Sequence, residues 1–309
     1  MFYSENTSLN KSLSRLGFGG AAVSGEGGGY GFGDMSEAQA EKLLKEVWEA
    51  GINLFDTAPI YGFGLSEERM GKYLPKEAFI VTKGGVDWHS TKRVNMSNDP
   101  KIMEKMFFES LKRLNREYID LYMIHWPDPR VDIRRPMEVL RKLQEKSLIN
   151  HVGLCNTNLD ELKKASEIGP ISSIQSELNL LNRKPFDELE GEWKKYFSMS
   201  WGTLDKGILS GRVLKDRKYD ASDARSWAPW WNKKEVVLKI ERVEKLQKIL
   251  SDYNIGLSRF CVHFNLNLYG ISSCLVGLKS SADLLEMTFN LQQNIPSEIM
   301  EEVLKRWEG

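Results

Sequence analysis

Short apolar segments of strand type alternate with longer segments of helical periodicity along almost the whole chain. The expected strands span residues 15–18, 52–55, 78–82, 120–125, 150–154, 173–175, 197–201 and 272–276. Such alternation indicates βαβ units, in which parallel strands are joined through helices by right-handed connections. About eight such units close most naturally into a barrel whose functional site lies at the carboxyl ends of the strands. The sequence therefore predicts an α/β fold, a (β/α)8 TIM barrel that forms a single domain over residues 1–309.

Local signals place the helices between these strands. Capping-box patterns mark two helix starts, at Ser36 with Gln39 and at Asn158 with Glu161. Ser66 is expected to cap a short helix that ends at residue 73. The remaining helices are expected over residues 101–114, 133–146, 185–195, 235–253 and 281–291. A doubly wound sheet is the alternative architecture, but it requires a domain boundary that the sequence does not show.

One long segment, residues 212–232, has no regular pattern. It contains three tryptophans, Trp227, Trp230 and Trp231. A loop of this length in a compact fold is usually functional or mobile. The sequence leaves open whether these tryptophans close a site or pack on the outer helices.

The charge balance argues against a nucleic-acid partner. The 309 residues include 43 Lys or Arg and 43 Asp or Glu, so the net charge is zero and attraction to a polyanion is weak. Three widely spaced cysteines, Cys155, Cys261 and Cys274, match neither a disulfide framework nor a zinc site. No segment approaches the roughly 18 apolar residues needed to span a membrane, and no signal-peptide pattern is present. A cytoplasmic protein without a membrane partner is expected, as a monomer or a small homo-oligomer.

Residues 17–22 have the sequence GFGGAA, which matches the dinucleotide-binding pattern G-x-G-x-x-A directly after a predicted strand. In that motif the glycines open a helix whose amino end meets the pyrophosphate. Here the pattern runs into the glycine-rich stretch 24–31, which an α-helix does not tolerate. These glycines are therefore expected to form a loop at the mouth of a site rather than part of a Rossmann fold.

Chemically active side chains end three successive predicted strands. Asp56 follows the second strand and Tyr61 comes five residues later, while Lys83 and His125 end the third and fourth strands. In a parallel barrel these strand ends converge on one face, so the four groups are expected to meet there. Each residue alone is best explained as a cap, a surface charge or a packed side chain. Together, in register with the barrel, they favour an active site.

Several motifs in the same order resemble the aldo-keto reductase superfamily. They are residues 51–74 (GINLFDTAPIYGFGLSEERMGKYL), TKGG from Thr82, residues 118–129 (YIDLYMIHWPDP), residues 153–156 (GLCN), residues 175–180 (QSELNL) and residues 207–211 (GILSG). The resemblance extends from about residue 16 to about residue 291. The HWPDP stretch is most similar to bacterial members of the inositol-operon and general-stress type. The resemblance implies a (β/α)8 barrel that uses NADP(H) or NAD(H), without a metal, to reduce aldehydes and ketones to alcohols.

The resemblance assigns a catalytic tetrad to Asp56, Tyr61, Lys83 and His125. Reduction of a carbonyl group needs a proton at oxygen, and a phenol with a pKa of about 10 is a slow donor unless that pKa is lowered. Lys83 is expected to lower the pKa of Tyr61, and Asp56 to hold Lys83 charged and oriented. His125 is expected to orient the carbonyl oxygen through a hydrogen bond.

The same resemblance implies where the cofactor binds. Asn156 and Gln175 would bind the nicotinamide carboxamide, because amide side chains donate and accept hydrogen bonds at once. Trp201 stands where the family has a stacking tyrosine, and its flat face should preserve the stacking. The further cofactor residues that the resemblance implies are Gly20, Leu204, Gly207 and Gly277.

Nucleotide preference depends on few residues near the start of the last predicted helix. Lys279 and Ser280 would contact the 2′-phosphate of NADP(H), which is attracted to a cation and to a helix amino end. Glu286 would lie near the adenosine ribose, where a carboxylate can favour NAD(H). NADP(H) is therefore expected as the preferred cofactor, with NAD(H) as the alternative.

The sequence gives fewer clues to the substrate. Trp88 and Trp126 follow strands that carry tetrad residues, so they are expected to line a pocket for a small carbonyl compound or a sugar. Some members of the superfamily are instead cofactor-binding regulatory subunits of membrane channels, and such subunits can retain the tetrad. The sequence predicts an NADP(H)-preferring reductase or sugar dehydrogenase, with the regulatory subunit as the alternative.

Overall fold

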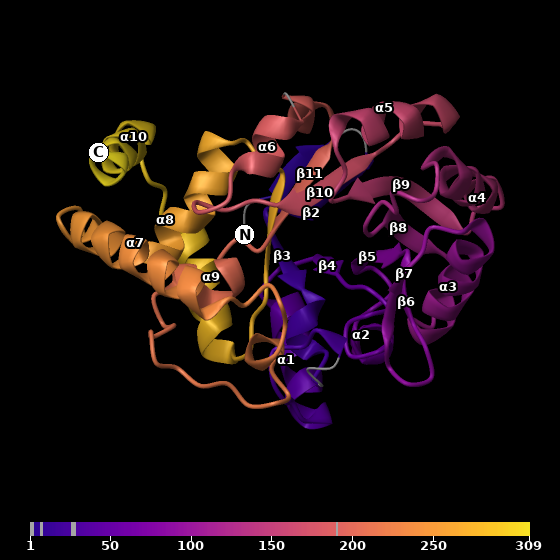
Figure 1. Cartoon of the computed structure of the whole chain (residues 1–309), viewed down its shortest axis with the longest axis horizontal. Helices are drawn as coiled ribbons and strands as arrows, with labels where there is room; N and C mark the ends of the chain where they lie inside the picture. The colour runs from indigo at the N-terminus through magenta and orange to yellow at the C-terminus, as the bar shows by residue number, and fades with distance from the viewer. Residues whose placement is uncertain (1–2, 7–8, 26–28, 190) are drawn as a thin grey trace.

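Eight parallel strands form a closed barrel in the computed structural model, which describes residues 3–6, 9–25, 29–189 and 191–309 (Figure 1). The strands are β3 (Leu16–Gly19), β4 (Leu54–Asp56), β5 (Phe79–Gly84), β8 (Ile119–Ile124), β9 (Ile149–Cys155), β10 (Ser173–Glu177), β11 (Phe197–Trp201) and β12 (Ser273–Val276). Each strand pairs with the next one along the chain, and β12 pairs with β3 to close the barrel. The predicted (β/α)8 barrel is confirmed.

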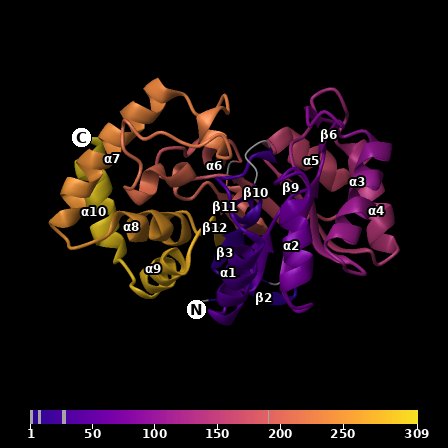
Figure 2. The same cartoon turned by 90° about the horizontal axis from the view of Figure 1, so that it is seen from below.

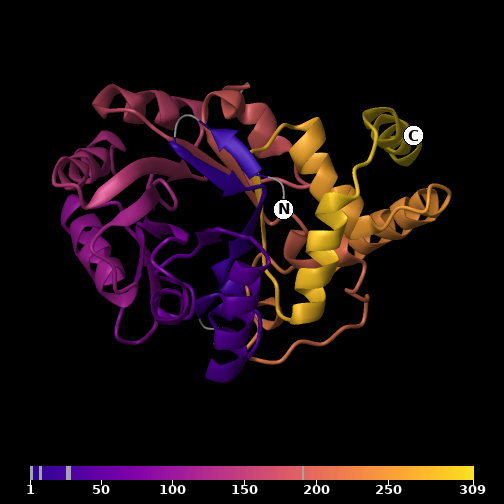
Figure 3. The ribbon, with the colours of Figure 1, turned by 180° about the vertical axis from the view of Figure 1, so that it is seen from behind.

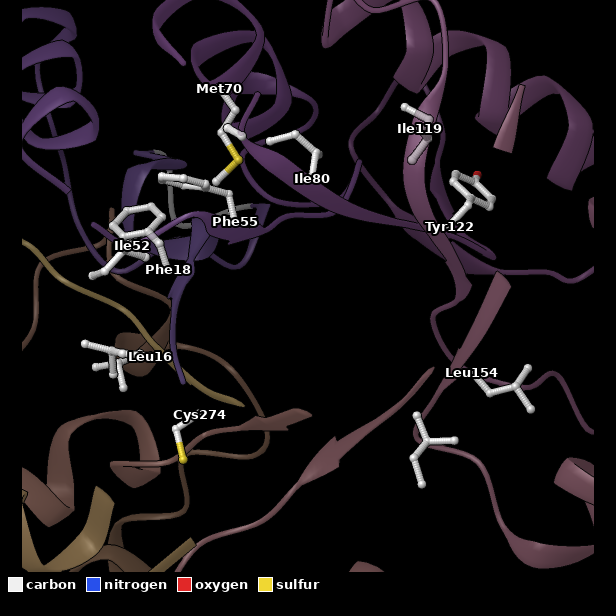
Figure 4. Packing of buried hydrophobic residues seen from close by; sticks show 14 of the residues in the cluster. Leu16, Phe18, Ile52, Phe55, Met70, Ile80, Ile119, Tyr122, Leu154 and Cys274 are labelled. Carbon is white, nitrogen blue, oxygen red and sulfur yellow. The ribbon is translucent and has the colours of Figure 1, made fainter. Parts of the chain in front are cut away.

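Side chains alternate between the inside and the outside of the barrel along each strand. Leu54 and Val81 belong to an apolar cluster inside the barrel, whereas their neighbours Phe55 and Ile80 belong to the cluster between the strands and the helices. Figure 4 shows this outer cluster, which also contains Leu16, Phe18, Ile52, Met70, Ile119, Tyr122, Leu154 and Cys274. The alternation fixes which side chains can point into the space above the barrel.

Helices cover the outside of the barrel. They are α1 (Glu37–Glu49), α2 (Leu65–Tyr73), α3 (Pro100–Arg113), α4 (Arg134–Glu145), α5 (Leu159–Ile168), α8 (Leu257–His263) and α9 (Ser281–Gln292). The capping boxes predicted at Ser36 and Asn158 are both present. Across the described ranges, none of the helices combines the length and apolar character that a membrane span requires.

The predicted cap at Ser66 is wrong. Gly64, in the left-handed conformation at φ 99°, precedes α2, and Ser66 lies within the first turn of the helix. The Ser66 hydroxyl accepts a hydrogen bond from the Thr57 hydroxyl at 2.8 Å and donates one to the Gly20 carbonyl oxygen at 2.9 Å. The side chain therefore joins α2 to the loop after β3 instead of capping the helix.

The helix predicted over residues 185–195 is divided into two short pieces. These are α6 (Lys184–Glu188) and a 3-10 helix (Glu192–Lys195). Gly191 precedes the second piece in the left-handed conformation, at φ 83°. A continuous helix cannot contain that conformation, so the prediction of a single helix is wrong.

The C-terminal part of the chain contains more helix than predicted. α7 (Lys233–Ser251) is confirmed, whereas α8 and α10 (Ser297–Glu308) are not anticipated from the sequence. A second apolar cluster joins α7 to α10, with Leu246 and Val303 among its fully buried members. The two helices lie side by side at one edge of the molecule in Figures 1 and 2.

Two antiparallel hairpins are also absent from the prediction. β1 (Tyr3–Asn6) and β2 (Lys11–Ser14) lie across the amino-terminal end of the barrel, in indigo in Figure 3. Leu13 of this hairpin packs into the cluster inside the barrel. The second hairpin, β6 (Val86–Trp88) with β7 (Val94–Met96), directly follows β5 and therefore lies at the opposite end.

A four-residue 3-10 helix, Gly20–Val23, follows β3 where a dinucleotide-binding motif would start an α-helix. The prediction that no such α-helix begins here is confirmed, while residues 26–28 of the glycine-rich stretch lie outside the described residues. A Cβ atom at Gly20 would lie 2.6 Å from the carbonyl oxygen of Asp56. Glycine is therefore required for the loop after β3 to approach the end of β4.

Candidate active site

A cavity of about 770 Å³ opens at the carboxyl ends of the barrel strands. Three residues of the predicted tetrad, Asp56, Tyr61 and His125, line it, and Lys83 lies fully buried behind Asp56. The lining also includes these predicted cofactor and substrate residues: Gly20, Asn156, Gln175, Trp201, Leu204, Gly207, Gly277, Lys279, Glu286 and Trp126. The barrel thus gathers most of the predicted residues around one space.

Asp56 and Lys83 form a buried ion pair at the base of the cavity. Asp56 is the last residue of β4 and Lys83 lies one residue before the end of β5, and the two strands are paired. Lys83 Nζ donates to Asp56 Oδ1 at 2.6 Å and to the carbonyl oxygen of Thr57 at 2.9 Å. Because both side chains are almost completely buried, water screens their attraction only weakly.

Tyr61 lies close to this ion pair, in the turn after β4. Its ring centroid is 5.5 Å from Lys83 Nζ and 6.0 Å from the ring centroid of His125, which meets it edge-on at 88°. His125 directly follows β8, and its backbone amide donates to the carbonyl oxygen of Gly84 at 2.8 Å. The phenol and the imidazole therefore line the cavity side by side.

Burial determines the protonation states of this group. It raises the pKa of Tyr61 to about 12, and the charge of Lys83 opposes that rise only in part. Burial disfavours the charged form of Lys83, but the carboxylate of Asp56 and the neighbouring Tyr61 outweigh it and raise the pKa of Lys83. Burial, aided by Lys83, lowers the pKa of His125 well below its usual range. The expected effect of Lys83 on Tyr61 is thus correct in direction, but the expected net lowering of the tyrosine pKa is wrong.

Gln175 uses its amide to hold Asp56. Its Nε2 donates to Asp56 Oδ1 at 2.8 Å, and its Oε1 accepts from Cys155 Sγ at 3.2 Å. Burial raises the pKa of Cys155, so the thiol keeps the proton that it donates. The amide expected to meet a nicotinamide carboxamide is therefore engaged with the tetrad carboxylate.

Asn156 connects Trp201 to the tetrad. Its backbone has a φ of 54°, an uncommon conformation for a residue other than glycine and one that is often found at functional sites. Its Oδ1 accepts from Trp201 Nε1 at 2.9 Å, and its Nδ2 donates to the carbonyl oxygen of His125 at 3.0 Å. These bonds fix the indole of Trp201 at the cavity wall.

A strained turn after β11 adds a charged group that sequence reasoning missed. Asp205, Lys206 and Gly207 have φ angles of 40°, 54° and 102°. Lys206 forms an ion pair with Glu177 of β10, and its Nζ lies 5.6 Å from the ring centroid of Trp201. A left-handed turn built from Asp and Lys has no sequence signal, since neither residue type requires that conformation.

Lys279 and Ser280 differ in their relation to the cavity. Lys279 lines it, and its Nζ donates to the carbonyl oxygens of Ala22 at 3.2 Å and Gly33 at 3.1 Å. Burial lowers the pKa of Lys279. Ser280 caps α9, where its hydroxyl accepts from the backbone amide of Asp283 at 3.2 Å. Ser280 is not among the residues that line the cavity, and its contact with the cofactor stays a prediction.

Three arginines missed in the sequence, Arg212, Arg217 and Arg225, line the same end of the cavity. All belong to the segment 212–232, which is irregular apart from a 3-10 helix at Ala224–Ser226. Arg212 forms ion pairs with Asp283 at 2.7 Å and with Glu286. Glu286 therefore shares the positive charge of Arg212 with Asp283. Arginines spaced irregularly along a loop give no pattern that could have identified them.

The two predicted substrate residues, Trp88 and Trp126, differ in their relation to the cavity. Trp126 lines the cavity and lies edge to face with Trp201, at 6.4 Å between ring centroids. Trp88 is not among the residues that line it. Its ring packs against Phe63 at 5.5 Å between ring centroids, and its contact with a substrate stays a prediction.

The loop tryptophans have different positions. Trp230 lines the cavity, where its ring centroid lies 5.8 Å from Lys206 Nζ. Trp227 packs against Tyr30 at 5.6 Å between ring centroids. Trp231 packs edge-on against Tyr219 at the same distance. One of the three therefore faces the site and two hold the surrounding loops.

A (β/α)8 barrel that places a tyrosine, a histidine and a buried lysine–aspartate pair at a cavity beyond the carboxyl ends of its strands is typical of an oxidoreductase. The chain belongs to the aldo/keto reductase family, whose family model matches residues 15–308. It is 29% identical over 294 residues to the aldo-keto reductase YhdN of Bacillus subtilis, covering 92% of this chain and 87% of that protein. It is 27% identical over 303 residues to the NADH-specific methylglyoxal reductase of Escherichia coli, covering 92% and 91%.

Solved structures share the architecture. A glycerol dehydrogenase from Gluconobacter oxydans superimposes with a TM-score of 0.84 at 26% identity, covering 98% of this chain and 94% of that chain. An aldo-keto reductase from Bacillus halodurans has a TM-score of 0.82 at 20% identity, covering 99% and 96%, and this likeness concerns the fold alone. The barrel and its surrounding helices are therefore those of the family.

Proposed function

We propose that the protein is an NAD(P)H-dependent oxidoreductase that reduces an aldehyde or ketone to an alcohol. The observation that carries this proposal is the meeting of Tyr61, His125 and the Asp56–Lys83 pair at one wall of the cavity. Carbonyl reduction needs a hydride at carbon and a proton at oxygen, and a bound nicotinamide supplies the hydride. The side chains of this site provide the proton and stabilise the developing charge.

Tyr61 is the proton donor in this proposal. Its pKa of about 12 keeps the phenol protonated at neutral pH, which is the form that reduction requires. When the proton leaves, the charge of Lys83 stabilises the phenolate, and Asp56 keeps Lys83 charged. His125, neutral because its pKa is lowered, donates a hydrogen bond from a ring nitrogen to the carbonyl oxygen.

The cavity suits a nicotinamide dinucleotide. It extends from Tyr61 to the amino end of α9, and its lining changes from aromatic side chains to cations along the way. The fixed indole of Trp201 offers a flat face to a nicotinamide ring. The amino end of α9, beside Lys279, offers positive charge to phosphate groups.

We further propose that NADP(H) is preferred over NAD(H). This is supported by the cations in the lining, which are Lys206, Arg212, Arg217, Arg225 and Lys279. NAD(H) is the alternative, since family membership alone does not fix the nucleotide and one relative is named NADH-specific. The preference is tested below by direct binding measurements.

We propose that the protein acts in the cytoplasm. Its proposed partner is a small-molecule carbonyl compound or a sugar. The cysteines at positions 155, 261 and 274 are buried free thiols, as is usual in a reducing compartment. A monomer or a small homo-oligomer is proposed, and light scattering of the purified protein measures its size.

Turnover separates this proposal from a regulatory cofactor-binding subunit. Purified protein with NADPH and a panel of aldehydes and ketones should lose the absorbance of the reduced nicotinamide. Tyr61→Phe is the matched control, because it should bind NADPH but not turn over. Tight NADPH binding by the wild type without turnover of any carbonyl compound would refute the enzyme and favour the regulatory subunit.

A further inference from the structure

The hairpin β6–β7 turns one apolar face toward the active site. Its register pairs Val86 with Met96, Trp88 with Val94, and Asp87 with Asn95. Residues opposite each other in an antiparallel pair project to the same side, and successive residues project to opposite sides. The four apolar residues therefore share one face of the hairpin, and the polar pair occupies the other face.

This apolar face forms the wall next to the proposed proton donor. Three of its members line the cavity, namely Val86, Val94 and Met96. Val86 and Val94 pack in a small apolar cluster that also contains Tyr61. Trp126, on the loop after β8, continues this wall. The phenol of Tyr61 is thus set in an apolar surface.

Charged side chains concentrate on the other side of the cavity. Among the described lining residues between positions 56 and 126, Asp56 alone is charged, and Lys83 neutralises it. The remaining charged lining residues all occur from position 177 onward, on β10 or after it. Since β4, β5 and β8 are neighbours and β10, β11 and β12 lie across the barrel, the cavity has an apolar half and a charged half.

The apolar wall is held in a fixed position. Asn98, two residues after the hairpin and almost fully buried, donates from Nδ2 to the carbonyl oxygen of Trp126 at 3.2 Å. Its Oδ1 accepts from the backbone amide of Asp128 at 2.7 Å. Arg130 pairs with Asp128 at 2.8 Å and also donates to the carbonyl oxygen of Met96. A substrate would meet a preformed surface and lose little affinity to ordering it.

We infer that the substrate is an uncharged aldehyde or ketone whose carbonyl carries an alkyl or aryl group of several carbons. This inference rests on the proposed function and narrows its substrate class. Met96 is 37% exposed and Trp126 is 42% exposed, so both offer apolar surface that such a group can cover. A carboxylate in this half would lose its water without gaining a cation, which is unfavourable.

A series of aldehydes tests the inference with saturating NADPH. From propanal to hexanal, kcat/KM should rise roughly three- to fourfold for each added methylene group, as expected for burial of that group. Hexanal should exceed its anionic counterpart, 5-oxopentanoate, by about 100-fold or more, because the apolar half rejects an unpaired charge. Glyceraldehyde should also be a poorer substrate than hexanal.

A charge placed on the β6–β7 hairpin tests whether the alkyl or aryl group of the substrate binds at its apolar face. Met96→Lys should lower kcat/KM for hexanal about tenfold and raise it about tenfold for 5-oxopentanoate, because the new ammonium lies in the apolar half. Asn95→Lys adds the same charge to the opposite face of the same hairpin and should change neither value more than about twofold. Retained NADPH affinity shows that both variants are folded.

The outcomes separate this inference from the proposed function. Reduction of glyceraldehyde or 5-oxopentanoate at least as efficiently as hexanal would overturn the inference while the enzyme stands. Equal effects of Met96→Lys and Asn95→Lys on the two aldehydes would likewise overturn it. Failure to reduce any carbonyl compound would refute the proposed function and the inference with it.

Discussion

Lys83 Nζ lies 2.6 Å from Asp56 Oδ1, at the ends of two paired strands and almost completely shielded from water. Breaking such a pair is costly, since the remaining charge keeps its burial and loses its partner. Gln175 adds a second donor to the same carboxylate oxygen at 2.8 Å. The carboxylate therefore has a fixed position from which it orients Lys83 beside Tyr61.

Removal of one partner should therefore destabilise the fold more than removal of both. Asp56→Asn leaves the Lys83 ammonium without its counter-charge and should lower the free energy of unfolding by about 3 to 5 kcal/mol. The double variant Asp56→Asn with Lys83→Met should recover part of this loss. Guanidinium chloride unfolding of the wild type, both single variants and the double variant gives the coupling energy. Additive effects would show that the two charges do not stabilise each other.

The pH dependence of reduction should be flat between about pH 6 and pH 9. Reduction needs Tyr61 protonated, so the rate falls only as pH rises through the pKa of that phenol, about 12. His125 stays neutral across this range because its pKa is lowered well below the ordinary value. Initial rates in constant-ionic-strength buffers measure the profile. A basic limb with a midpoint near pH 9, or an acidic limb near the ordinary histidine pKa, would contradict these protonation states.

Substitutions of the two residues that face the carbonyl oxygen should differ in effect. Tyr61→Phe removes the proton donor and should lower kcat by a factor of about 10² or more, with NADPH affinity nearly unchanged. His125→Ala should change both kcat and KM, because it removes the group that orients the substrate. Steady-state kinetics and fluorescence titration with NADPH measure both. Wild-type turnover by Tyr61→Phe would show that another group donates the proton.

The barrel and the tetrad were predictable because their signals are local and periodic. Each tetrad residue lies at the end of a strand with a clear apolar pattern or shortly after it, so the barrel alone brings them together. The hydrogen bond from Gln175 to Asp56 joins residues 119 positions apart and has no sequence signal. Ser66 was misassigned because a serine ahead of a helical pattern suggests a cap, whereas its actual partners come from the tertiary structure.

The second hairpin and the cations that line the cavity could not be predicted from the sequence, for other reasons. β6 and β7 have three residues each, too short for their alternation to stand out from a loop. The net rise in the pKa of Tyr61 depends on how deeply the phenol is buried, which no motif reveals. Loop residues such as Arg217 reach the cavity only through the path of an irregular segment.

Arg225 should control how tightly the cofactor is held. Its guanidinium makes two bonds to Asp223, at 2.9 and 2.6 Å, and one to the carbonyl oxygen of Lys206 at 3.0 Å. It thereby ties the segment 212–232 to the strained turn after β11. Arg225→Lys loses the paired geometry and should raise the Kd for NADPH roughly tenfold, through faster release. Stopped-flow fluorescence measures the release rate.

A matched control is available in the helix that packs against α10. Arg242 of α7 lies with its guanidinium 4.7 Å from the ring centroid of Trp307, and it does not line the cavity. Arg242→Lys makes the same chemical change away from the site and should leave NADPH release unchanged. An unchanged release rate in Arg225→Lys, or an equal change in both variants, would show that the bonds of Arg225 do not control cofactor release.

The nucleotide preference should depend on Lys279. A charge-assisted contact of about 1.5 to 3 kcal/mol would favour NADPH over NADH by roughly 10- to 150-fold, and added salt should reduce that ratio. Lys279→Met should lower NADPH affinity by that factor. It should lower NADH affinity less, because the lost bonds to Ala22 and Gly33 loosen the loop for both nucleotides, whereas the lost phosphate contact affects NADPH alone.

Lys215→Met is the control for this measurement, because it removes the same charge from a lysine of the segment 212–232 that pairs with Glu241 at 3.2 Å and does not line the cavity. It should leave both dissociation constants unchanged. Fluorescence titrations with NADPH and NADH give the ratio of the two dissociation constants for the wild type and for the variants Lys279→Met, Lys215→Met and Arg217→Met. Equal affinities in the wild type would refute the NADP(H) preference. A preference that survives Lys279→Met but is lost in Arg217→Met would place the phosphate contact on Arg217, whose described hydrogen bond goes to the carbonyl oxygen of Arg212 and involves no carboxylate.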